Sequence, residues 1–321
     1  MADPAERFAY DIGLTTRFRG ITRRQGMVWR GPAGWAEWSP FLDYHGAELA
    51  PWLAAAEEAA EFGFPAAVRD RVPVNCTIPA VGPEQAYAIA ARSGCGTAKV
   101  KVAEPGQSLA DDQARVDAVR DALGPAGRIR VDANGGWDHE VAVEALRVLS
   151  RVELEYAEQP VASVEELARL RRTLVRKGIS VPIAADESIR RSGDPERVAA
   201  LGAADVAVLK VQPLGGVRRC LELAESLGLP VVVSSALETS VGLAAGVALA
   251  AALPELPFAC GLNTRALLVD DLVSDSLIAV DGEIAVRPVS VDVEALQRCA
   301  AADEDRAAWL TRLDETREVL A

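Results

Sequence analysis

The chain has 321 residues, of which 50% are hydrophobic and 25% are charged, so it is long and apolar enough to bury a large core. Its formal net charge is -13 and its sequence pI is about 4.8, and no run of basic residues alternates with aromatic ones. This composition excludes a largely disordered chain and disfavours nucleic acid as a partner.

Two features of the sequence predict a soluble, cytoplasmic protein without a membrane partner. The opening MADPAERFAY lacks a basic region followed by an apolar stretch, and the most apolar later segment, residues 241–253, is too short to span a bilayer. The five cysteines are scattered and never spaced as CxxC, which predicts buried free thiols and argues against a disulfide framework or a thiolate zinc site.

The segment before residue 73 differs in pattern from the rest of the chain. FAYDIGL and MVWRGPAGWAEWSPF are typical of antiparallel strands joined through a Pro/Gly turn, and residues 45–62 are typical of an Ala-rich helix. We expect residues 1–72 to form a separate α+β capping domain.

From residue 73 onward, short apolar runs alternate with helical patterns, which indicates repeated βα units around a parallel sheet. One helix has a capping box of Ser163 and Glu166 and a closing Gly178. Eight strands with seven intervening helices predict a closed barrel over residues 73–274. The predicted strands are VPVNCTI (72–78), TAKVKV (97–102), RIRVDA (128–133), LEYAEQ (154–159), PIAADE (182–187), VAVLKVQ (206–212), PVVVSSA (230–236) and FACGLN (258–263).

The last part of the chain, residues 275–321, has signals of its own. SLIAVDGEIAV contains the Asp-Gly pair that is typical of a β-hairpin turn, and helix-prone sequence follows from residue 291. We expect this tail to return to the N-terminal segment and complete the cap.

Charged residues stand at or near the C-terminal ends of five predicted strands, although a buried parallel strand is expected to be an almost continuous apolar run. They recur at intervals of roughly 30 residues, the length of one βα unit, so they should converge on the barrel rim where such enzymes carry their chemistry. Three carboxylates on adjacent strands form an oxygen-only site, which suits Mg²⁺ or Mn²⁺ and not zinc. The charged residues are Lys99 and Lys101, Asp132, Glu158, Asp186 with Glu187, and Lys210.

Lysine is used sparingly in this chain. Only four of the 34 basic residues are lysines, and three of those four lie in predicted strands. A desolvated lysine near a divalent cation can act as a base near neutral pH, whereas arginine cannot. Because side chains alternate along a strand, Lys99 and Lys101 share one face and can both point inward.

The ordered set of strand-end motifs resembles the enolase superfamily, specifically its muconate lactonizing enzyme subgroup. The motifs are KVK (99–101), DANGGW (132–137), EQP (158–160), ADES (185–188) and KVQPLGG (210–216), and the resemblance covers essentially the whole chain. It implies a (β/α)7β modified TIM barrel with an α+β capping domain formed by the N-terminal segment and the C-terminal tail.

The resemblance also implies a role for each strand-end residue. The cofactor would be Mg²⁺, with Mn²⁺ as a substitute. The only histidines, His45 and His139, precede the later strands, which excludes the mandelate racemase branch with its histidine on the seventh strand. The metal ligands would be Asp132, Glu158 and Asp186, the acid/base lysine Lys101, the facing lysine Lys210, and the supporting residues Lys99, Asn134 and Glu187.

Within this subgroup, the stretches SSALETSVGLAAG and CGLNTRALLVDDL resemble bacterial o-succinylbenzoate synthases, and TTRFRGITRRQG resembles the cap loop of actinobacterial members. This resemblance implies a hydro-lyase of menaquinone biosynthesis. It would take a small carboxylate, 2-succinyl-6-hydroxy-2,4-cyclohexadiene-1-carboxylate, and release water to give 2-succinylbenzoate. The same barrel motifs serve N-succinylamino acid racemases, dipeptide epimerases and muconate cycloisomerases, and a barrel that has kept the fold without the activity is a more remote alternative.

In the implied reaction, Lys101 takes the proton next to the carboxylate and assists the departure of hydroxide, while Lys210 stabilises the planar intermediate. In a racemase Lys210 would be the second acid/base. Hydroxyl and main-chain groups at later strand ends can hold the succinyl arm, and cap arginines can neutralise its carboxylate. The candidates are Ser234, Ser235, Gly261, Asn263 and Arg19, with Arg17, Arg23 and Arg24 as further cap arginines.

Overall fold

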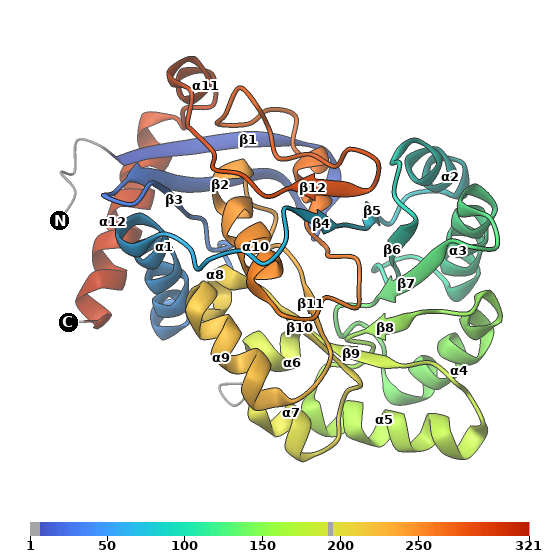
Figure 1. Ribbon diagram of the computed structural model, residues 1–321. Helices are drawn as coiled ribbons and strands as arrows, with labels where there is room; N and C mark the ends of the chain where they lie inside the picture. The colour runs from blue at the N-terminus through green and yellow to red at the C-terminus, as the bar shows by residue number, and fades with distance from the viewer. Residues whose placement is uncertain (1–6, 192–194, 321) are drawn as a thin grey trace.

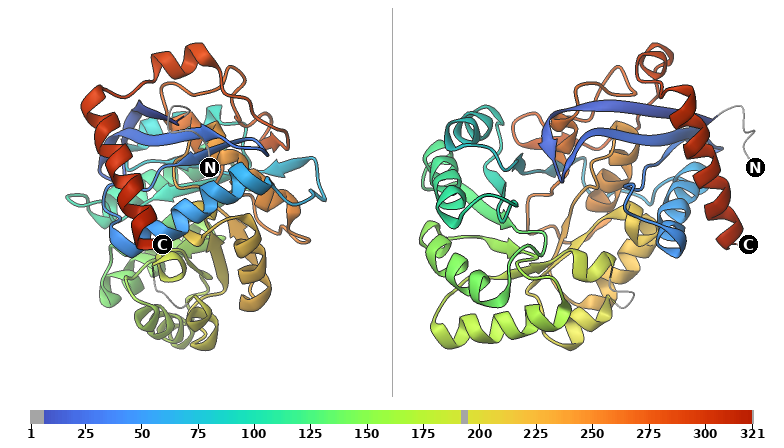
Figure 2. Two further views of the ribbon diagram at one scale, coloured as in Figure 1. Left: turned by 90° about the vertical axis from the view of Figure 1, so that its left-hand side faces the viewer. Right: turned by 180° about the vertical axis from the view of Figure 1, so that it is seen from behind.

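The computed structural model describes residues 7–191 and 195–320 (Figure 1). A ring of parallel strands with helices on its outside forms the larger part of the molecule, and a three-stranded antiparallel sheet lies across one end of it. Figure 2 shows the C-terminal helix lying against that antiparallel sheet, so the first strand and the last helix of the described chain lie on the same side of the molecule. No helix in the described part of the chain is long and apolar enough to cross a membrane.

The antiparallel sheet contains β1 (Arg7–Phe18), β2 (Ile21–Arg30) and β3 (Trp35–Trp38), paired in chain order. The predicted Pro/Gly turn lies between β2 and β3. A single 3-10 turn (Gly46–Leu49) precedes α1 (Ala50–Phe62), so the α-helix begins later than the predicted residue 45. Proline is favoured in the first turn of a helix, and α1 has one there.

The segment TTRFRGITRRQG is mostly strand, and the expectation of a cap loop is wrong for most of it. Its first half completes β1 and its second half begins β2, because the two halves pair with each other. Only Arg19 and Gly20 form the turn between them, and both have a positive φ. The resulting hairpin is short enough to hold Phe18 and Arg19 in one place.

The parallel sheet follows the predicted strands in chain order, each hydrogen-bonded to the next. Its strands are β5 (Cys76–Ile78), β6 (Thr97–Lys101), β7 (Arg128–Asp132), β8 (Tyr156–Glu158), β9 (Ile183–Ala185), β10 (Val206–Leu209) and β11 (Val231–Val233). The helices of this region are α2 (Pro83–Arg92), α3 (Leu109–Leu123), α4 (His139–Leu149) with a 3-10 turn (Ser150–Val152), α5 (Val164–Lys177), α6 (Glu187–Arg190), α7 (Glu196–Ala200), α8 (Val211–Leu214), α9 (Val217–Leu227) and α10 (Ser240–Ala252).

The eighth predicted strand, residues 258–263, forms single bridges in place of a regular strand. Cys260 bridges Val74 and Gly261 bridges Ser234, and these bridges close the ring between β5 and β11. A 3-10 turn (Asn263–Leu267) follows at once and ends the extended backbone. The predicted (β/α)7β barrel is therefore confirmed, with its last strand reduced to the residues that close it.

The predicted helix signals appear in α5. The Ser163 side chain accepts a hydrogen bond from the Glu166 amide, the Glu166 carboxylate accepts one from the Ser163 amide, and Gly178 ends the helix with φ of 69°. The apolar face of α5 is buried against the barrel. This agreement is expected, because capping and periodicity depend on residues close together in the chain.

The C-terminal tail contains β12 (Glu283–Ala285), α11 (Val293–Arg298) and α12 (Asp303–Leu320). The Asp281–Gly282 turn is present, but β12 pairs with β4 (Arg71–Pro73) and meets its own preceding segment at one bridge only. The predicted hairpin is thus replaced by a pairing of distant segments. The helix α12 packs on the antiparallel sheet, where Trp309 meets Trp38 edge to face with ring centroids 5.5 Å apart.

The two largest buried clusters of the described residues organise these parts. One lies in the barrel, and the other lies beneath β1 to β3 and includes α1, α12 and residues after β11. Residues 1–6 of the predicted cap lie outside the described residues, and the domain boundaries at 72/73 and 274/275 stay predictions. The arrangement places the antiparallel sheet over the rim where the strand-end charges emerge.

Candidate active site

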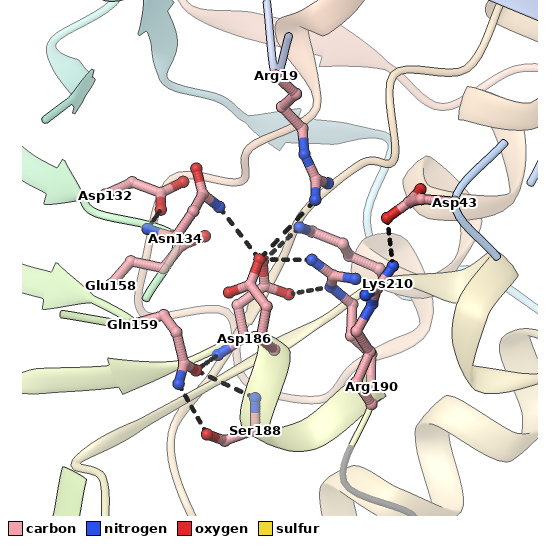
Figure 3. A network of polar contacts seen from close by, with 12 residues as sticks. Arg19, Asp43, Asp132, Asn134, Glu158, Gln159, Asp186, Ser188, Arg190 and Lys210 are labelled. Atoms are coloured by element: carbon pink, nitrogen blue, oxygen red, sulfur yellow. Dashed lines mark hydrogen bonds and ion pairs between the residues drawn. The ribbon is translucent and has the colours of Figure 1, made fainter. Parts of the chain in front are cut away.

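Three carboxylates stand at the same edge of three neighbouring strands. Asp132 ends β7, Glu158 ends β8 and Asp186 directly follows β9. Strand register pairs Asp132 with Glu158, and all three side chains are almost completely buried. Figure 3 shows them projecting toward a common region from their separate strand ends.

Three ammonium groups contact these carboxylates. Lys99 Nζ lies 3.0 Å from both carboxylate oxygens of Glu158 and 3.5 Å from Asp132 Oδ2. Lys101 Nζ donates to Asp132 Oδ2 at 2.6 Å, and Lys210 Nζ donates to Asp186 Oδ2 at 2.6 Å. The two predicted acid/base lysines therefore lie at opposite ends of the row of carboxylates, on β6 and just after β10.

The carboxylates differ in proton affinity because their partners differ. Burial, and then the nearby charges of Asp132 and Asp186, raise the pKa of Glu158 to about 7. Burial alone would also raise the pKa values of Asp132 and Asp186. The Lys101 ammonium at Asp132 and the Arg190 guanidinium at Asp186 outweigh it and hold both pKa values below their usual range.

The two most buried lysines are shifted in opposite directions. Burial acts to lower the pKa of Lys99, but Glu158 and Asp132 together outweigh it and raise that pKa. Burial also acts on Lys210, and there the attraction of Asp186 is too weak to compensate, so the pKa of Lys210 is lowered. Lys99 is therefore a fixed positive charge, whereas Lys210 is closer to giving up its proton.

The donor set fits a hard divalent cation. Its oxygens come from three buried carboxylates, and oxygen ligands suit Mg²⁺ and Mn²⁺. In the part of the chain that the structure describes, no three Asp, Glu, His or Cys side chains are gathered into a ready metal cluster. The Lys99 ammonium bridges Glu158 and Asp132 and balances part of their negative charge.

The predicted supporting residues connect this row to its rim. Asn134 Oδ1 accepts from Lys101 Nζ at 2.6 Å, and Asn134 Nδ2 donates to Glu187 Oε1 at 3.1 Å. Glu187 also pairs with Arg190 at 2.5 Å, and Arg19 Nη2 of the β1–β2 turn lies 4.0 Å from Glu187 Oε1 (Figure 3). Asn134 and Glu187 thus link the lysine on β6 to the far end of the row.

A pocket opens above the carboxylate row, between the barrel rim and the antiparallel sheet. It brings together Lys101, Asp132 and Lys210 with four of the five predicted substrate contacts. Its lining is Phe18, Arg19, Phe41, Thr77, Lys99, Lys101, Asp132, Lys210, Ser234, Ser235, Ala236, Leu237, Gly261 and Thr264.

The structure does not bring Asn263 to this pocket. Its carboxamide accepts from the amide of Ala279 at 3.2 Å and points toward the Cys95 thiol. Among the other cap arginines, Arg23 pairs with Asp11 at 2.8 Å, and the Arg24 side chain is buried beneath β2.

Sequence reasoning missed pocket residues of two kinds. Phe18, Phe41 and Leu237 are apolar, and nothing in their neighbourhood in the sequence distinguishes them from core residues. Thr77 offered a weak signal, because it is a polar residue inside the apolar first strand of the barrel. His45 and His139 do not line this pocket; His139 lies at the start of α4, 3.3 Å from the Thr173 hydroxyl.

Known proteins resemble this chain in sequence, and solved structures resemble it in fold. Residues 83–290 match the family described as enolase C-terminal domain-like, and residues 9–60 match the family described as enolase N-terminal domain-like. The chain is 63% identical over 309 residues to an o-succinylbenzoate synthase of Thermobifida fusca (strain YX), which covers 96% of this chain and 95% of that protein. It is 54% identical over 304 residues to an o-succinylbenzoate synthase of Mycolicibacterium smegmatis, over 94% of this chain and 92% of that protein.

Solved structures extend the likeness at the level of the fold. A muconate lactonizing enzyme from Pseudomonas fluorescens, complexed with muconolactone, has a TM-score of 0.79 at 22% identity, over 92% of this chain and 98% of that chain. An N-succinyl Arg/Lys racemase from Bacillus cereus has a TM-score of 0.77 at 20% identity, over 92% of this chain and 97% of that chain. Both support the barrel with its antiparallel cap.

Proposed function

The chain belongs to the enolase superfamily, and within it to the o-succinylbenzoate synthase family, and from this membership we propose its reaction. The proposed reaction converts 2-succinyl-6-hydroxy-2,4-cyclohexadiene-1-carboxylate to 2-succinylbenzoate and water. The substrate is a small carboxylate, and the reaction removes one proton and one hydroxide from it. The product ring becomes aromatic.

The observation that carries the proposal is the order of charges on five successive strand ends. Lysine, aspartate, glutamate, aspartate and lysine follow one another from β6 to β10, at Lys101, Asp132, Glu158, Asp186 and Lys210. The proton to be removed stands next to a carboxylate, so a cation must meet that carboxylate and a base must meet the proton. A row of carboxylates with a lysine at each end supplies both.

We propose that Asp132, Glu158 and Asp186 hold one Mg²⁺, with Mn²⁺ as a substitute. When bound, the divalent cation supplies positive charge to the substrate carboxylate and to the ene-diolate that forms as the proton leaves. Asp132 carries the charge that also holds the Lys101 ammonium at 2.6 Å.

Lys101 is proposed as the acid/base group. Neutral Lys101 Nζ takes the α-proton, becomes an ammonium, and then gives the proton to the departing hydroxide, which leaves as water. Lys210 Nζ meets the planar intermediate from the other end of the row, and Lys99 keeps its positive charge beside Glu158. Asn134 accepts from Lys101 Nζ and keeps it directed at the pocket.

Racemisation of N-succinylamino acids is the second candidate activity. The placement of Lys210 favours it, because a second amine at the far end of the row could protonate the opposite face of the same intermediate. Dipeptide epimerisation, muconate cycloisomerisation and a non-catalytic barrel are weaker alternatives, since the high identity to o-succinylbenzoate synthases supports none of them.

A cytoplasmic location is also proposed. All five cysteines are buried free thiols, as the sequence predicts. Free thiols are typical of a reducing compartment.

The test offers the purified protein the cyclohexadiene substrate and, separately, an N-succinylamino acid, with Mg²⁺ and after removal of metal with a chelator. We expect rapid, Mg²⁺-dependent formation of 2-succinylbenzoate, observed by absorbance, and slower or no racemisation. Faster turnover of the N-succinylamino acid would reverse the order of the two candidates. Turnover of neither compound would contradict the proposal.

A further inference from the structure

One wall of the pocket is main chain in an uncommon conformation. Ser234, Ser235, Ala236 and Leu237 lie between β11 and α10 and line the pocket. Leu237 has φ of 65°, the left-handed region that non-glycine residues rarely adopt. Such a residue keeps this conformation only when surrounding contacts enforce it. The contacts that enforce it therefore decide the shape of the pocket.

A buried arginine of the antiparallel sheet makes those contacts. Arg24 is 2% exposed, and its Nε donates to Leu237 O at 3.0 Å while its Nη2 donates to Ala236 O at 3.2 Å. Two successive carbonyls of the pocket wall are thus held by one guanidinium, across more than two hundred residues of chain. A planar group with several donors suits this task.

The same guanidinium also joins the wall to the roof of the pocket. Its remaining hydrogen bonds go to the main-chain oxygens of Gln25 and Ser39 and to Ser39 Oγ. It lies over the ring of Phe41, 4.4 Å from the centroid, and Phe41 lines the pocket from the other side. Arg24 itself is not among the residues that line the pocket.

Glu37 of β3 fixes the residues that follow the wall. Its carboxylate accepts from the Thr239 amide at 3.2 Å and from the Gly242 amide at 3.0 Å, at the N-terminus of α10. It also accepts from Ser39 Oγ at 2.7 Å, and Ser39 is the residue that Arg24 holds. A carboxylate is stabilised at a helix N-terminus by the free amides and the helix dipole. The start of α10 and the wall before it are therefore anchored to the same sheet.

We propose that Arg24 is a positioning residue, which acts through the Ala236–Leu237 main chain to hold the pocket wall in its substrate-binding shape. This inference rests on the proposed function, because it assigns the pocket to the dehydration substrate. The wall contains Ser234 and Ser235, the hydroxyl residues predicted to hold the succinyl arm, so it borders the part of the substrate that does not react. Loss of Arg24 should therefore weaken substrate binding more than it slows the chemical step.

The test compares Arg24→Met with Arg69→Met. Arg69 is a matched control, because its guanidinium donates to main-chain oxygens at the opposite end of α10, including Leu253 O at 2.7 Å and Pro254 O at 3.2 Å. For Arg24→Met we expect KM to rise about tenfold or more while kcat changes by less than about threefold. Arg69→Met should lower thermal stability without changing KM. Equal KM values for Arg24→Met and the parent protein would overturn the proposal.

Hydrogen exchange tests the same idea without any substrate. The amides of Ala236, Leu237 and Thr239 should exchange faster in Arg24→Met and at the parent rate in Arg69→Met. This measurement separates the inference from the proposed function, because it holds or fails whether or not the protein dehydrates the cyclohexadiene. Unchanged exchange at these amides would contradict the positioning role.

A second substitution tests whether Arg24 acts by holding Leu237 in its left-handed conformation. Leu237→Gly allows positive φ at no steric cost, so Arg24 should matter less in that background. We expect the rise in KM caused by Arg24→Met to be several-fold smaller when Leu237→Gly is also present. Arg24→Lys, which keeps the charge but cannot fork between two carbonyls, should fall between the parent and Arg24→Met. Equal rises in KM in both backgrounds would show that Arg24 only joins the sheet to the barrel.

Discussion

Glu158 is the carboxylate in the row whose charge is least compensated in the absence of metal. Burial, with Asp132 and Asp186 nearby, raises its pKa to about 7. Below that pH a proton competes with a cation for its oxygens, so the affinity for Mg²⁺ should fall by about tenfold per pH unit as the pH drops below about 7. Glu158→Gln should lower Mg²⁺ affinity and turnover together, and it should remove this pH dependence.

Calorimetric titration of Mg²⁺ between about pH 6 and about pH 8 measures both effects. Glu155→Gln is the control, because Glu155 lies next to the same strand but pairs with Arg128 and Arg130 at the other edge of the sheet. It should bind Mg²⁺ as the parent protein does. A Glu158→Gln protein with parental affinity would show that Glu158 is not a ligand.

The two lysines at the ends of the row should differ in function. Lys101→Ala removes the proposed base and should abolish both dehydration and α-proton exchange, since a positioned base contributes a rate factor of about 10² to 10⁴. Lys210→Arg keeps a cation that cannot act as a base near neutral pH. It should retain measurable dehydration and lose any racemisation.

Proton exchange in deuterated water, measured by NMR on metal-loaded protein, distinguishes these outcomes. The assignment of roles fails if the Lys210→Arg protein racemises normally or if Lys101→Ala dehydrates at the parent rate. Circular dichroism of each variant shows whether the larger guanidinium has disturbed the buried site, since Lys210 is 5% exposed.

At the scale of single elements, the barrel is closed by single bridges and not by a regular strand. Residues 258–263 contribute only bridges, and a buried arginine on β7 reinforces them from inside the ring. Arg130 Nη1 donates to Ala259 O at 2.6 Å and to Asn75 Oδ1 at 3.2 Å, and its Nε donates to Glu155 at 2.5 Å. Its guanidinium also lies 4.7 Å from the ring centroid of Tyr156. This side chain joins the two segments that the regular sheet leaves apart.

Arg130→Met should therefore lower the free energy of unfolding by about 3–5 kcal/mol, because Asn75 Oδ1 and Ala259 O lose their buried charged donor and Glu155 keeps only the exposed Arg128 as a partner. Arg128 pairs with the same Glu155 but has a 65% exposed side chain, so Arg128→Met should cost less than about 1 kcal/mol. Urea denaturation of the two variants measures the difference. Similar losses for both would show that closure does not depend on Arg130.

At the scale of the whole molecule, the antiparallel sheet covers the barrel rim and supplies the roof of the pocket. Of the segment from Arg17 to Gly26, only Phe18 and Arg19 line that pocket. The Arg19 guanidinium lies over the Phe41 ring at 4.8 Å, and Arg17 is exposed. The β1–β2 turn, together with Phe41, is thus the part of the cap that can select a substrate.

Arg19→Leu should raise KM for the dehydration substrate by about tenfold, because it removes a cation that can meet the succinyl carboxylate. Arg17→Leu changes the same residue type two positions earlier, on β1 and outside the lining of this pocket, and should leave KM unchanged. Steady-state kinetics of both proteins on the cyclohexadiene substrate and on an N-succinylamino acid provide the measurement. If neither KM nor substrate preference changes in Arg19→Leu, selection lies in the barrel loops.

The sequence by itself determined the repeated βα units, the three carboxylates at neighbouring strand ends and the order of charges along the rim. The physical reason is that the parallel strands pair in chain order, so consecutive βα units along the chain are also adjacent in space. Capping boxes and apolar periodicity are equally local, and α5 forms where they predict it. The family resemblance, confirmed by the comparisons, rests on this same ordered set.

Only the tertiary structure decided which residues close over that rim. Phe18 reaches the pocket from the end of β1, and Phe41 reaches it from the segment after β3. Arg24 holds a wall more than two hundred residues away, and Asn263 turns away from the pocket despite its place in a strand-end motif. The tail pairs β12 with β4 although its Asp-Gly turn is typical of a local hairpin. These contacts join segments that are distant in the chain, and no spacing or periodicity within a segment records which distant partner it will meet.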